Sequence, residues 1–544
     1  MNKLFKELLE KRGLTPDFLD PKYENLTNPN ELSDMKKAVD RILQAKEKGE
    51  KVLIYGDYDV DGVTATTIMA RSLKAAGIKD LSTMLPDRFV DGYGMSSRLI
   101  ERAKKEKIQL VVTVDCGSNN DVIIDQLNQE KIDVIVTDHH EVSGELPDAV
   151  AVINPKRPDF RLRAENEPKI AGLMDLSGAG VAFMLARALV DAGAIPFGQE
   201  KWLMDLAMVG IICDSMKLTG DNRIICYYGF IVLKKTRRPG FKELIRVADI
   251  KKLNSTAIGY QIGPRLNAAG RMKTAEKALE LLMTDSPMKA AELAEELNKL
   301  NLGRRAQQQA AIKEVEEFGV NEDPVLVVNG KWNEGIVGII SGKLTERYKK
   351  PSFVLTEVGG EYKGSGRSFG DFNLALALKE CEDILTSGGG HAEACGVKFP
   401  KDKLDEFTER VNRYYRSLHL PDQRKYFDVT EDLTVAELSD LDTELIDDLA
   451  KMEPFGEGNP EPIFRLKDTV IISTMRMGKE EQHLRLIVKD DWGNTFKLVA
   501  FNAEDDWLDL SSGMQLDIWA TLMDNEWNGT RSVEGRILKL SVAI

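Results

Sequence analysis

Three aspartates at every second position follow the first strongly apolar stretch of the chain. Residues 52–56, VLIYG, predict a buried strand. Asp57, Asp59 and Asp61 come directly after it, and Gly62 predicts a sharp turn before a helix of small and β-branched residues. Carboxylates held close together raise one another's pKa and resist sharing a site unless a cation neutralises them. The motif therefore indicates a metal site, with an acidic surface turn as the alternative.

Two later apolar stretches end in side chains of the same kind. QLVVTVDCG leads to Asp115, and IDVIVTDHH leads to Asp138, His139 and His140. Both are continuous runs, as expected of parallel strands that helices bury on both faces. Open α/β sheets place their sites outside the carboxyl ends of the strands, so three successive strand ends favour one shared site. Carboxylates with histidine and without a cysteine ligand favour Mn²⁺ or Mg²⁺ over structural zinc.

A fourth acid stands at the end of an apolar helix predicted over 202–213, WLMDLAMVGIIC. Asp214 follows that helix, where a negative charge opposes the helix macrodipole. A metal ion would explain its position, and so would exposure to solvent.

Length and composition limit the classes of protein that can carry such a site. A chain of 544 residues predicts two to four domains. A net charge of −14 requires any nucleic-acid contact to be a local groove. Five scattered cysteines, at positions 116, 213, 226, 381 and 395, favour a reducing cytoplasm over a disulfide framework. The N-terminal sequence has no apolar signal region, and no run of about 18 apolar residues occurs, so we expect neither secretion nor a membrane span.

Arginine and glycine gather in three segments of the middle of the chain. GPRLNAAGR combines small residues with Arg265 and Arg271, whose forked guanidiniums match phosphate oxygens. Residues 275–318 predict an almost continuous helix between domains, followed by a new α/β unit from Asp323 onward. In that unit GSGRS and GGGHAEACG predict glycine-rich turns that hold an anion, or two ordinary loops between strands.

The last 120 or so residues have a different character. Nine acidic residues and no basic ones lie between Asp428 and Asp448, which predicts a solvated helix or, alternatively, a protein-docking patch. After PFGEGNPEP, short alternating stretches predict a small β-barrel such as an OB-fold, which binds single strands by stacking bases on aromatic rings. The candidate rings are Trp492, Phe496, Phe501, Trp507, Trp519 and Trp527.

Taken together in their order along the chain, these motifs resemble a known family. GDYDVDG, VDCG, TDHH, Asp214, GPRLNAAGRM, GSGRS, GGGHAEACG and PFGEGNPEP resemble the motifs of RecJ-type single-stranded-DNA-specific exonucleases of the DHH phosphoesterase superfamily. The resemblance implies an α/β fold with a parallel-sheet DHH domain, a second α/β DHH-associated domain joined by a long helix, and a C-terminal OB-fold barrel. The expected ranges are 1–45 for an N-terminal lead-in, 46–274 for the DHH catalytic domain and 275–320 for the connecting helix. The DHH-associated domain is expected over 321–425 and the OB-fold nucleic-acid-binding domain over 426–544.

The resemblance also implies roles for single residues. Two Mn²⁺ or Mg²⁺ ions would share Asp115, with Asp57 and Asp59 on one ion and Asp61, His139 and Asp214 on the other. His140 would lie beside the scissile phosphate. The expected substrate contacts, several of them at the 5′ phosphate, are Arg88, Arg265, Asn267, Arg271, Ser365, Arg367, Gly389, Gly390 and His391. Asn333 departs from the pattern, because a histidine is expected there.

The implied activity is 5′ to 3′ hydrolysis of single-stranded DNA to 5′-mononucleotides in DNA repair and recombination. The implied substrate partner is single-stranded DNA, and the implied protein partner is a single-strand-binding protein or a helicase. The protein is expected to be a cytoplasmic monomer. A DHH phosphodiesterase for short oligoribonucleotides or dinucleotides is one alternative, although such enzymes usually lack the terminal barrel. An inactive, replication-associated binder is another, although such relatives lose metal ligands that are present here.

Overall fold

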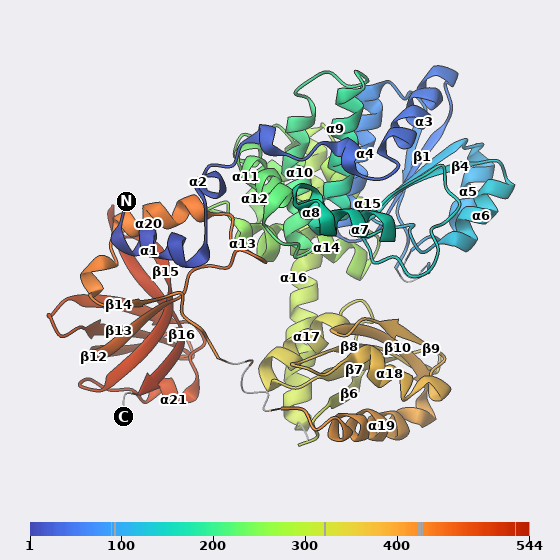
Figure 1. Ribbon diagram of the computed structural model, residues 1–544. Coiled ribbons are helices and arrows are strands. Elements are labelled where there is room, and N and C mark those ends of the chain that lie inside the picture. Colours follow the sequence, from blue (N-terminus) through green and yellow to red (C-terminus); the bar gives the residue numbers. More distant parts are fainter. Residues whose placement is uncertain are drawn as a thin grey trace.

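The structure, a computed structural model, describes residues 1–88, 90–91, 94–319, 322–421, 426, 428–527 and 529–542. It contains a parallel-sheet unit, a second α/β unit and a β-barrel, which confirms the predicted fold class (Figure 1). The long helix α16 (Pro287–Phe318) runs from the first unit to the second. Among the described residues, no helix has the length and apolarity needed to cross a bilayer.

The first sheet consists of five parallel strands in the order β2-β1-β3-β4-β5. Its central strands are fully buried, as expected for β-branched runs that helices cover on both faces. The chain moves from β1 to β2 in one direction and then to β3 on the other side of β1. This order places a topological switch point between β1 and β3. The strands are β1 (Val52–Gly56), β2 (Leu81–Met84), β3 (Leu110–Val114), β4 (Asp133–Thr137) and β5 (Ala151–Ile153).

Helices cover this sheet and extend the unit toward α16. Helix α4 begins after Asp59, whose side chain accepts a hydrogen bond from the Gly62 amide, and α9 begins after Ser177, whose hydroxyl accepts one from Gly180. The helices are α3 (Met35–Lys48), α4 (Val60–Ala76), α5 (Ser97–Glu106), α6 (Asp121–Gln129), α7 (Pro158–Asn166), α8 (Pro168–Ala171), α9 (Gly178–Asp191), α10 (Met204–Cys213), α11 (Gly220–Lys234), α12 (Pro239–Val247), α13 (Ser255–Ala257), the π-helix η5 (Ile258–Ile262), α14 (Gly263–Met272) and α15 (Glu276–Met283).

The helix expected over 275–318 is two helices. It is interrupted between α15 and α16, where the Ser286 hydroxyl accepts a hydrogen bond from Lys289 and Pro287 takes the first helical position. Proline cannot continue a preceding helix but is well suited to start one. The connecting helix is therefore α16 alone, because α15 packs on α4 of the first unit.

The second unit has the strand order β6-β7-β8-β10-β9, parallel only between β6 and β7. The two glycine-rich segments expected as turns are strands: GSGR ends β8, and SGGG is β9. Glycine allows close packing here, because a Cβ on Gly366 would lie 2.7 Å from Cys395 Sγ. The elements are β6 (Leu326–Gly330), α17 (Val337–Tyr348), β7 (Ser352–Val358), β8 (Glu361–Arg367), α18 (Leu374–Lys379), β9 (Ser387–Gly390), β10 (Ala394–Pro400) and α19 (Leu404–Ser417).

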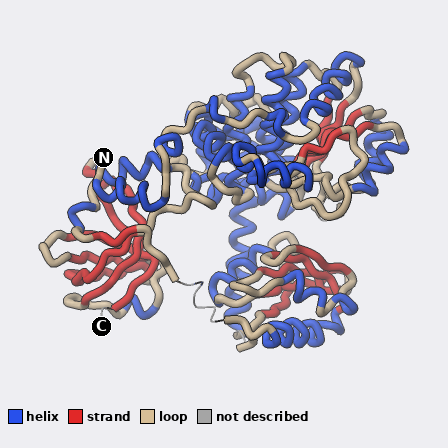
Figure 2. The backbone as a smooth tube through the Cα atoms, in the orientation of Figure 1, coloured by secondary structure: helices blue, strands red, loops and turns tan. Residues whose placement is uncertain are grey.

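The third unit is a barrel, seen as the separate group of strands in Figure 2. Strands run in the order β12-β13-β14-β16-β15, and β15 pairs back with β12 to close the barrel. Three of them are longer than the short strands expected, with 14 residues in β12 and 13 each in β15 and β16. The elements are β11 (Leu433–Val435), α20 (Thr443–Leu449), β12 (Phe464–Met477), β13 (His483–Lys489), β14 (Thr495–Ala500), α21 (Asp505–Leu508), β15 (Gln515–Trp527) and β16 (Thr530–Val542).

The acidic segment before the barrel is not a single solvated helix. It contains β11 and α20, and its carboxylates make specific contacts: Asp448 is buried and accepts a hydrogen bond from the Asn2 amide at 2.7 Å. Short 3₁₀ helices occur here and elsewhere, namely η1 (Tyr23–Asn25), η2 (Pro29–Glu31), η3 (Gly172–Asp175), η4 (Glu200–Leu203), η6 (Glu382–Ile384), η7 (Lys401–Lys403), η9 (Leu438–Asp440) and η10 (Ala450–Met452).

The N-terminal segment completes the barrel core rather than leading only into the first sheet. Helix α1 (Lys3–Arg12) places Leu4, Phe5 and Leu8 in the same apolar cluster as the barrel strands. Helix α2 (Pro16–Leu19) then approaches the first unit, where the Arg223 guanidinium lies 3.5 Å from the Phe18 ring. Arg223 also donates to backbone carbonyls of α2 and of the segment after α20. Residues 1–34, the N-terminal strap, therefore connect the barrel to the parallel-sheet unit.

Candidate active site

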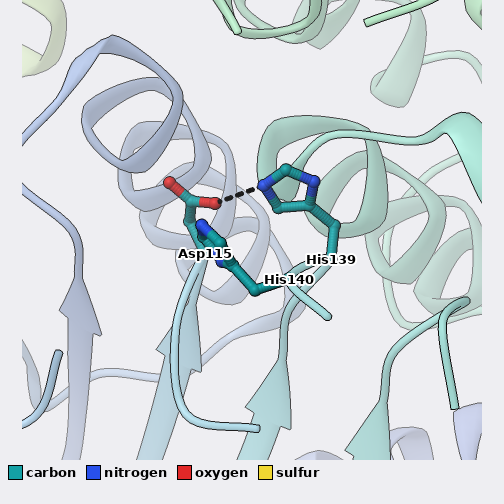
Figure 3. Close-up of side chains that lie close together, drawn as sticks. All are labelled: Asp115, His139 and His140. Carbon is teal, nitrogen blue, oxygen red and sulfur yellow. Dashed lines mark ion pairs between the residues drawn. The ribbon is translucent and has the colours of Figure 1, made fainter. Parts of the chain in front are cut away.

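The acids and histidines of the first sheet gather at the carboxyl ends of its strands. Asp57 follows β1, Asp115 follows β3, and the two histidines follow β4, while α10 brings Asp214 from another direction. Figure 3 shows Asp115, His139 and His140 directed toward one another from two neighbouring strand ends. Three groups of residues each have ligand atoms that all lie within 4.8 Å of one another. The groups are Asp57, Asp59 and Asp115; Asp61, His139 and Asp214; and Asp115, His139 and His140. We call this set the metal-ligand cluster.

His139 lies at the centre of the cluster. Its Nε2 atom is 3.1 Å from Asp115 Oδ1 and 3.5 Å from Asp214 Oδ2. Asp61 Oδ2 is slightly farther from the same nitrogen, at 3.9 Å. One nitrogen thus faces carboxylates from three different elements.

Asp61 is fixed by the N-terminus of α9. Its carboxylate accepts hydrogen bonds from the Gly178 amide at 2.6 Å, the Ser177 hydroxyl at 2.8 Å and the Ala179 amide at 3.1 Å. A helix N-terminus favours a negative charge, so these bonds hold the carboxylate in one position. Neighbouring glycines leave the space it needs, because a Cβ on Gly210 would lie 2.3 Å from Asp61 Oδ1.

Two backbone positions shape the cluster further. Asp115 has a φ of 63°, in the left-handed region that aspartate tolerates better than most residues. Gly62 is not the sharp turn expected from the sequence, because it lies inside α4. It is required for close approach instead, since a Cβ there would lie 2.5 Å from the Asp57 carbonyl oxygen.

Burial and mutual repulsion make the charged forms of the cluster's carboxyl groups unfavourable. Burial and the Asp59 charge raise the pKa of Asp57 to about 8. Burial and the Asp61 charge raise the pKa of Asp214 to about 8, and they raise that of Asp115 well above its usual range. Such raised pKa values mean that the charged carboxylate forms are unfavourable here unless a cation neutralises them.

The two histidines differ in their protonation. Burial lowers the pKa of His139 to about 4, so its ring is neutral and its nitrogens can act as ligands. Burial alone would lower the pKa of His140 too, but the hydrogen bond from its Nδ1 to Asp138 Oδ1, 2.8 Å long, and the Asp138 charge raise it to about 9. His140 is therefore a cation at neutral pH, and Asp138 orients it.

The donor set fits divalent cations such as Mn²⁺ or Mg²⁺. Oxygen ligands from carboxylates predominate in the three groups, which contain no thiolate, and of their two imidazoles only the neutral ring of His139 can act as a ligand. Two buried atoms, Asp115 Oδ1 and His139 Nδ1, make no hydrogen bond within the described part of the chain. Asp115 Oδ1 lies 3.1 Å from His139 Nε2, among the other ligand atoms, so a bound cation would supply the partner that this oxygen lacks.

A cavity next to the cluster is lined by residues from both α/β units. It has a volume of about 640 Å³, and we call it the anion cavity. Tyr58, between Asp57 and Asp59 in the sequence, lines it together with Arg88, whose guanidinium lies 5.4 Å from the Tyr58 ring. The second unit contributes Glu334, Val337, Gly338, Lys363, Gly364, Ser365, Arg367, Gly389, Gly390, Ala394, Cys395 and Gly396.

The structure divides the expected substrate residues into two groups. Arg88, Ser365, Arg367, Gly389 and Gly390 come together in the anion cavity. Arg265, Asn267, Arg271 and His391 are not among the described residues that line it. His391 is exposed beyond the end of β9, and Asn267 is half-buried on α14.

Arginines on α14 and α16 continue the positive charge beyond the anion cavity. Burial, and then the charges of Arg88 and Arg304, lower the pKa of Arg271 to about 10. Arg265 donates to Asn298 Oδ1 and to the Gln261 carbonyl, and Arg304 donates to Asn301 Oδ1. Because these acceptors are neutral, the guanidinium charges remain able to attract phosphate groups.

The aromatic candidates of the barrel do not form one exposed surface. Phe496 and Trp519 are buried, and the Trp519 indole donates to Glu431. Trp507 packs against the barrel core. Trp492 and Phe501 are exposed, at 65% and 57%. The side chain of Trp527 lies outside the described residues.

Several residues at the site escape prediction from the sequence. Tyr58 could have been found, because it lies inside the acidic motif itself. Ser177 and Gly178 carry no motif and are recognised only once α9 is placed against Asp61. Asn333, where a histidine was expected, accepts a hydrogen bond from the Gly335 amide and shapes a loop that touches α14, since a Cβ on Gly335 would lie 2.0 Å from the Arg271 carbonyl oxygen.

Comparison with known proteins agrees with this architecture. The chain matches the family models described as DHH family, N-terminal domain, at residues 51–211, DHHA1 domain at 322–417 and RecJ OB domain at 434–539. It is 34% identical to the single-stranded-DNA-specific exonuclease RecJ of Bacillus subtilis, over 99% of this chain and 68% of that protein. It is 30% identical to the RecJ of Escherichia coli, over 98% of this chain and 94% of that protein.

Solved structures give the same result. The crystal structure of RecJ in complex with Mn²⁺ from Thermus thermophilus superimposes with a TM-score of 0.85 at 29% identity, covering 100% of this chain and 76% of that one. The chain belongs to the RecJ family of single-stranded-DNA-specific exonucleases, because its domains match the family models and its sequence is similar to RecJ proteins over nearly its whole length.

Proposed function

We propose that the chain is a 5′ to 3′ exonuclease that hydrolyses single-stranded DNA to 5′-mononucleotides in DNA repair and recombination. The observation that carries the proposal is the position of the metal-ligand cluster directly beside a cavity lined by arginines. Tyr58 lines that cavity while its neighbours Asp57 and Asp59 belong to the cluster. A terminal phosphate bound in this cavity would bring the first phosphodiester bonds of the strand toward the cluster, as release of mononucleotides requires.

The ligand roles follow from the cluster. Asp57 and Asp59 would hold one Mn²⁺ or Mg²⁺ ion, Asp61, His139 and Asp214 would hold a second, and Asp115 would belong to both. Related structures are named as complexes with Mn²⁺ and with Mg²⁺. Two such ions, when bound, supply an activated water and stabilise the leaving 3′ oxygen.

The protein's own side chains would orient the substrate. His140 is positively charged and held by Asp138, so it is suited to donate a hydrogen bond to a nonbridging oxygen of the scissile phosphate. Ser365, Arg367 and Arg88 would bind the 5′ phosphate, since guanidiniums match its oxygens. Arg271 and Arg265 would contact phosphates outside the cavity, and Asn267 and His391 would be peripheral substrate contacts.

The wider setting is also part of the proposal. We infer a cytoplasmic monomer that works on single-stranded DNA together with a single-strand-binding protein or a helicase. Relatives from several bacteria and from a bacteriophage support a cytoplasmic location, because bacterial DNA lies there. The domain ranges given from the sequence stand as proposed boundaries, with the connecting element reduced to α16.

One assay tests the function directly. Single-stranded DNA, RNA and duplex DNA, each labelled at either end, are incubated with the protein and Mn²⁺, and the products are separated on a gel. We expect labelled mononucleotide to appear at once from 5′-labelled single-stranded DNA and only late from 3′-labelled strands. Equal attack from both ends, or preferred cleavage of duplex DNA or of very short RNA, would contradict the proposal.

A further inference from the structure

A cleft of about 810 Å³ lies between the parallel-sheet unit and the barrel. On one side it is lined by Cys213 and Ser215, which flank the cluster residue Asp214. On the other side it is lined by Phe455 and by Arg536 of β16. The cleft therefore extends from the two sequence neighbours of Asp214 to residues of the barrel unit.

The anion cavity and this cleft border the cluster through different residues. The cavity reaches it through Tyr58, between Asp57 and Asp59, whereas the cleft reaches it through the residues beside Asp214. A strand with its 5′ phosphate in the cavity and its scissile bond at the cluster would have its 3′ continuation directed into the cleft. This ordering assigns the cleft to nucleotides beyond the bond that is cut.

The cleft contains an unusually exposed aromatic side chain. Tyr260 is 81% exposed and lies in the middle of the π-helix η5. Ile258 and Ile262, at the ends of η5, are fully buried, and a Cβ on the next residue, Gly263, would lie 2.6 Å from Cys213 Sγ. The ring is thus presented to solvent by a backbone that is packed against the helix end leading to Asp214. Short π-helical segments frequently occur at functional sites.

Charges in the cleft favour a base over a phosphate. Glu457 and Glu461 line it together with Arg536, which pairs with Glu461 at 3.1 Å. The acids would repel a phosphodiester, whereas an aromatic ring accepts any base by stacking. Phosphate contact is available close by, because the Arg265 guanidinium donates to the Gln261 carbonyl of the same π-helix.

We propose that Tyr260 is a positioning residue on which a base of the strand stacks, on the 3′ side of the scissile bond. The inference rests on the proposed exonuclease function and adds a binding position to it. Stacking on Tyr260 holds the uncleaved 3′ part of the strand between the cluster and the barrel, so that the next phosphodiester is aligned after each cut. Arg265 neutralises the backbone on the same side.

The first test compares Tyr260→Ala, Tyr260→Phe and wild type on 5′-phosphorylated strands of 2 to 20 nucleotides. We expect Tyr260→Ala to raise KM about tenfold on long strands, to leave kcat within about twofold, and to match wild type on the shortest substrates. Tyr260→Phe keeps the ring and should behave as wild type. Phe197→Ala, which removes another highly exposed ring outside the cleft, is the matched control and should change nothing.

The second test measures binding without catalysis, by fluorescence anisotropy of a labelled 20-nucleotide strand in EDTA. Tyr260→Ala should weaken binding about tenfold with an unchanged salt slope, because it removes a stacking contact and no phosphate contact. Unaltered KM and affinity in Tyr260→Ala would overturn the inference, as would an equal loss at every substrate length or a loss in Tyr260→Phe. If instead wild type binds the strand but cleaves none of the substrates, the proposed function fails while the binding comparison still decides the role of Tyr260.

Discussion

The metal-ligand cluster and the anion cavity lie side by side but are built in opposite ways. The cluster is largely buried within one unit, around adjacent strand ends of one sheet, and its Asp61 carboxylate is fixed by hydrogen bonds to the start of α9. The cavity is open and takes Tyr58 and Arg88 from the first unit and Arg367 from the second. The chemistry therefore depends on local geometry, and recognition of the strand end depends on how two units meet.

This contrast predicts that changes in the cluster abolish catalysis, whereas changes in the cavity alter substrate preference. Asp115→Asn should give the largest effect. Asparagine also tolerates the left-handed backbone at this position, so folding should survive. The loss of a carboxylate shared between two ligand groups should lower kcat with Mn²⁺ below about 1% of wild type.

The measurement is single-turnover cleavage of 5′-labelled single-stranded DNA, with anisotropy as a check on binding and circular dichroism as a check on folding. A variant that retains more than a few per cent of wild-type turnover would show that Asp115 is not shared by the ions.

Gly178→Ala should have the next largest effect. A Cβ there would lie 2.4 Å from Asp115 Oδ1, so the carboxylate or the start of α9 must move. We expect a loss of activity of 10-fold or more, and destabilisation of about 1 to 3 kcal/mol, typical of overpacking. Thermal unfolding and cleavage rates measure both effects.

Gly303→Ala on α16 is the matched control, because a Cβ there meets nothing within 4 Å. It should stabilise the protein by about 0.5 to 1 kcal/mol and leave activity unchanged. Full activity in Gly178→Ala would mean that catalysis tolerates a movement of Asp115 or of the start of α9.

Arg367→Ala should affect the cavity alone. Its guanidinium donates to Ser365 Oγ and lies in the cavity, so we expect the preference for a 5′-phosphorylated over a 5′-hydroxyl strand to fall roughly 10- to 100-fold. The rate on 5′-hydroxyl strands should change little. Arg413→Ala, an exposed arginine on α19 of the same unit, is the control. An unaltered phosphate preference in Arg367→Ala would remove the cavity from 5′-end recognition.

The smallest expected effect is a pH-dependent gain in stability from Mn²⁺. The folded pKa of Asp57 is about 8, raised from 3.8, so without metal the folded state binds more protons than the unfolded state between those values. The free energy of unfolding of the metal-free protein should therefore fall as pH rises through this window. Bound cations stabilise the carboxylates and compete with protons.

Calorimetry measures the difference in Tm between the protein with Mn²⁺ and the protein in EDTA. This difference should be larger at pH 8 than at pH 6, and it should be smaller in Asp57→Asn than in wild type. A difference that is independent of pH would contradict the raised pKa.

The same contrast explains what the sequence can predict. Asp57, Asp115 and His139 each follow a β-branched strand, and parallel strands must bring their carboxyl ends to one edge, so a local pattern is sufficient. Arg88 and Arg367 belong to different units, and their meeting depends on the direction of α16, which no local pattern specifies. Arg265 illustrates the difficulty. The sequence motif identifies it as an arginine suited to bind phosphate, but on α14 its guanidinium donates to the Gln261 carbonyl and does not line the cavity.

Glycine-rich segments were the least predictable parts of the fold. GSGR and SGGG look like turns because glycine is permissive, but both are strands whose glycines allow close packing against β7 and β10. Tertiary contact decides between the two conformations, and it is invisible in a short window of sequence. The break at Thr284 to Ser286 was readable, since Ser286 and Pro287 form a typical helix start.

The N-terminal strap has a consequence for how the chain folds during synthesis. Helix α1 leaves the ribosome well before the barrel, because the partner of the Asn2 amide is 446 residues later, at Asp448. At about 5 to 20 residues per second, roughly half a minute or more passes before the barrel strands that cover Leu4, Phe5 and Leu8 exist. The apolar face of α1 must remain uncovered or be shielded by a chaperone for that time, and the barrel core closes only when α1 meets the barrel strands.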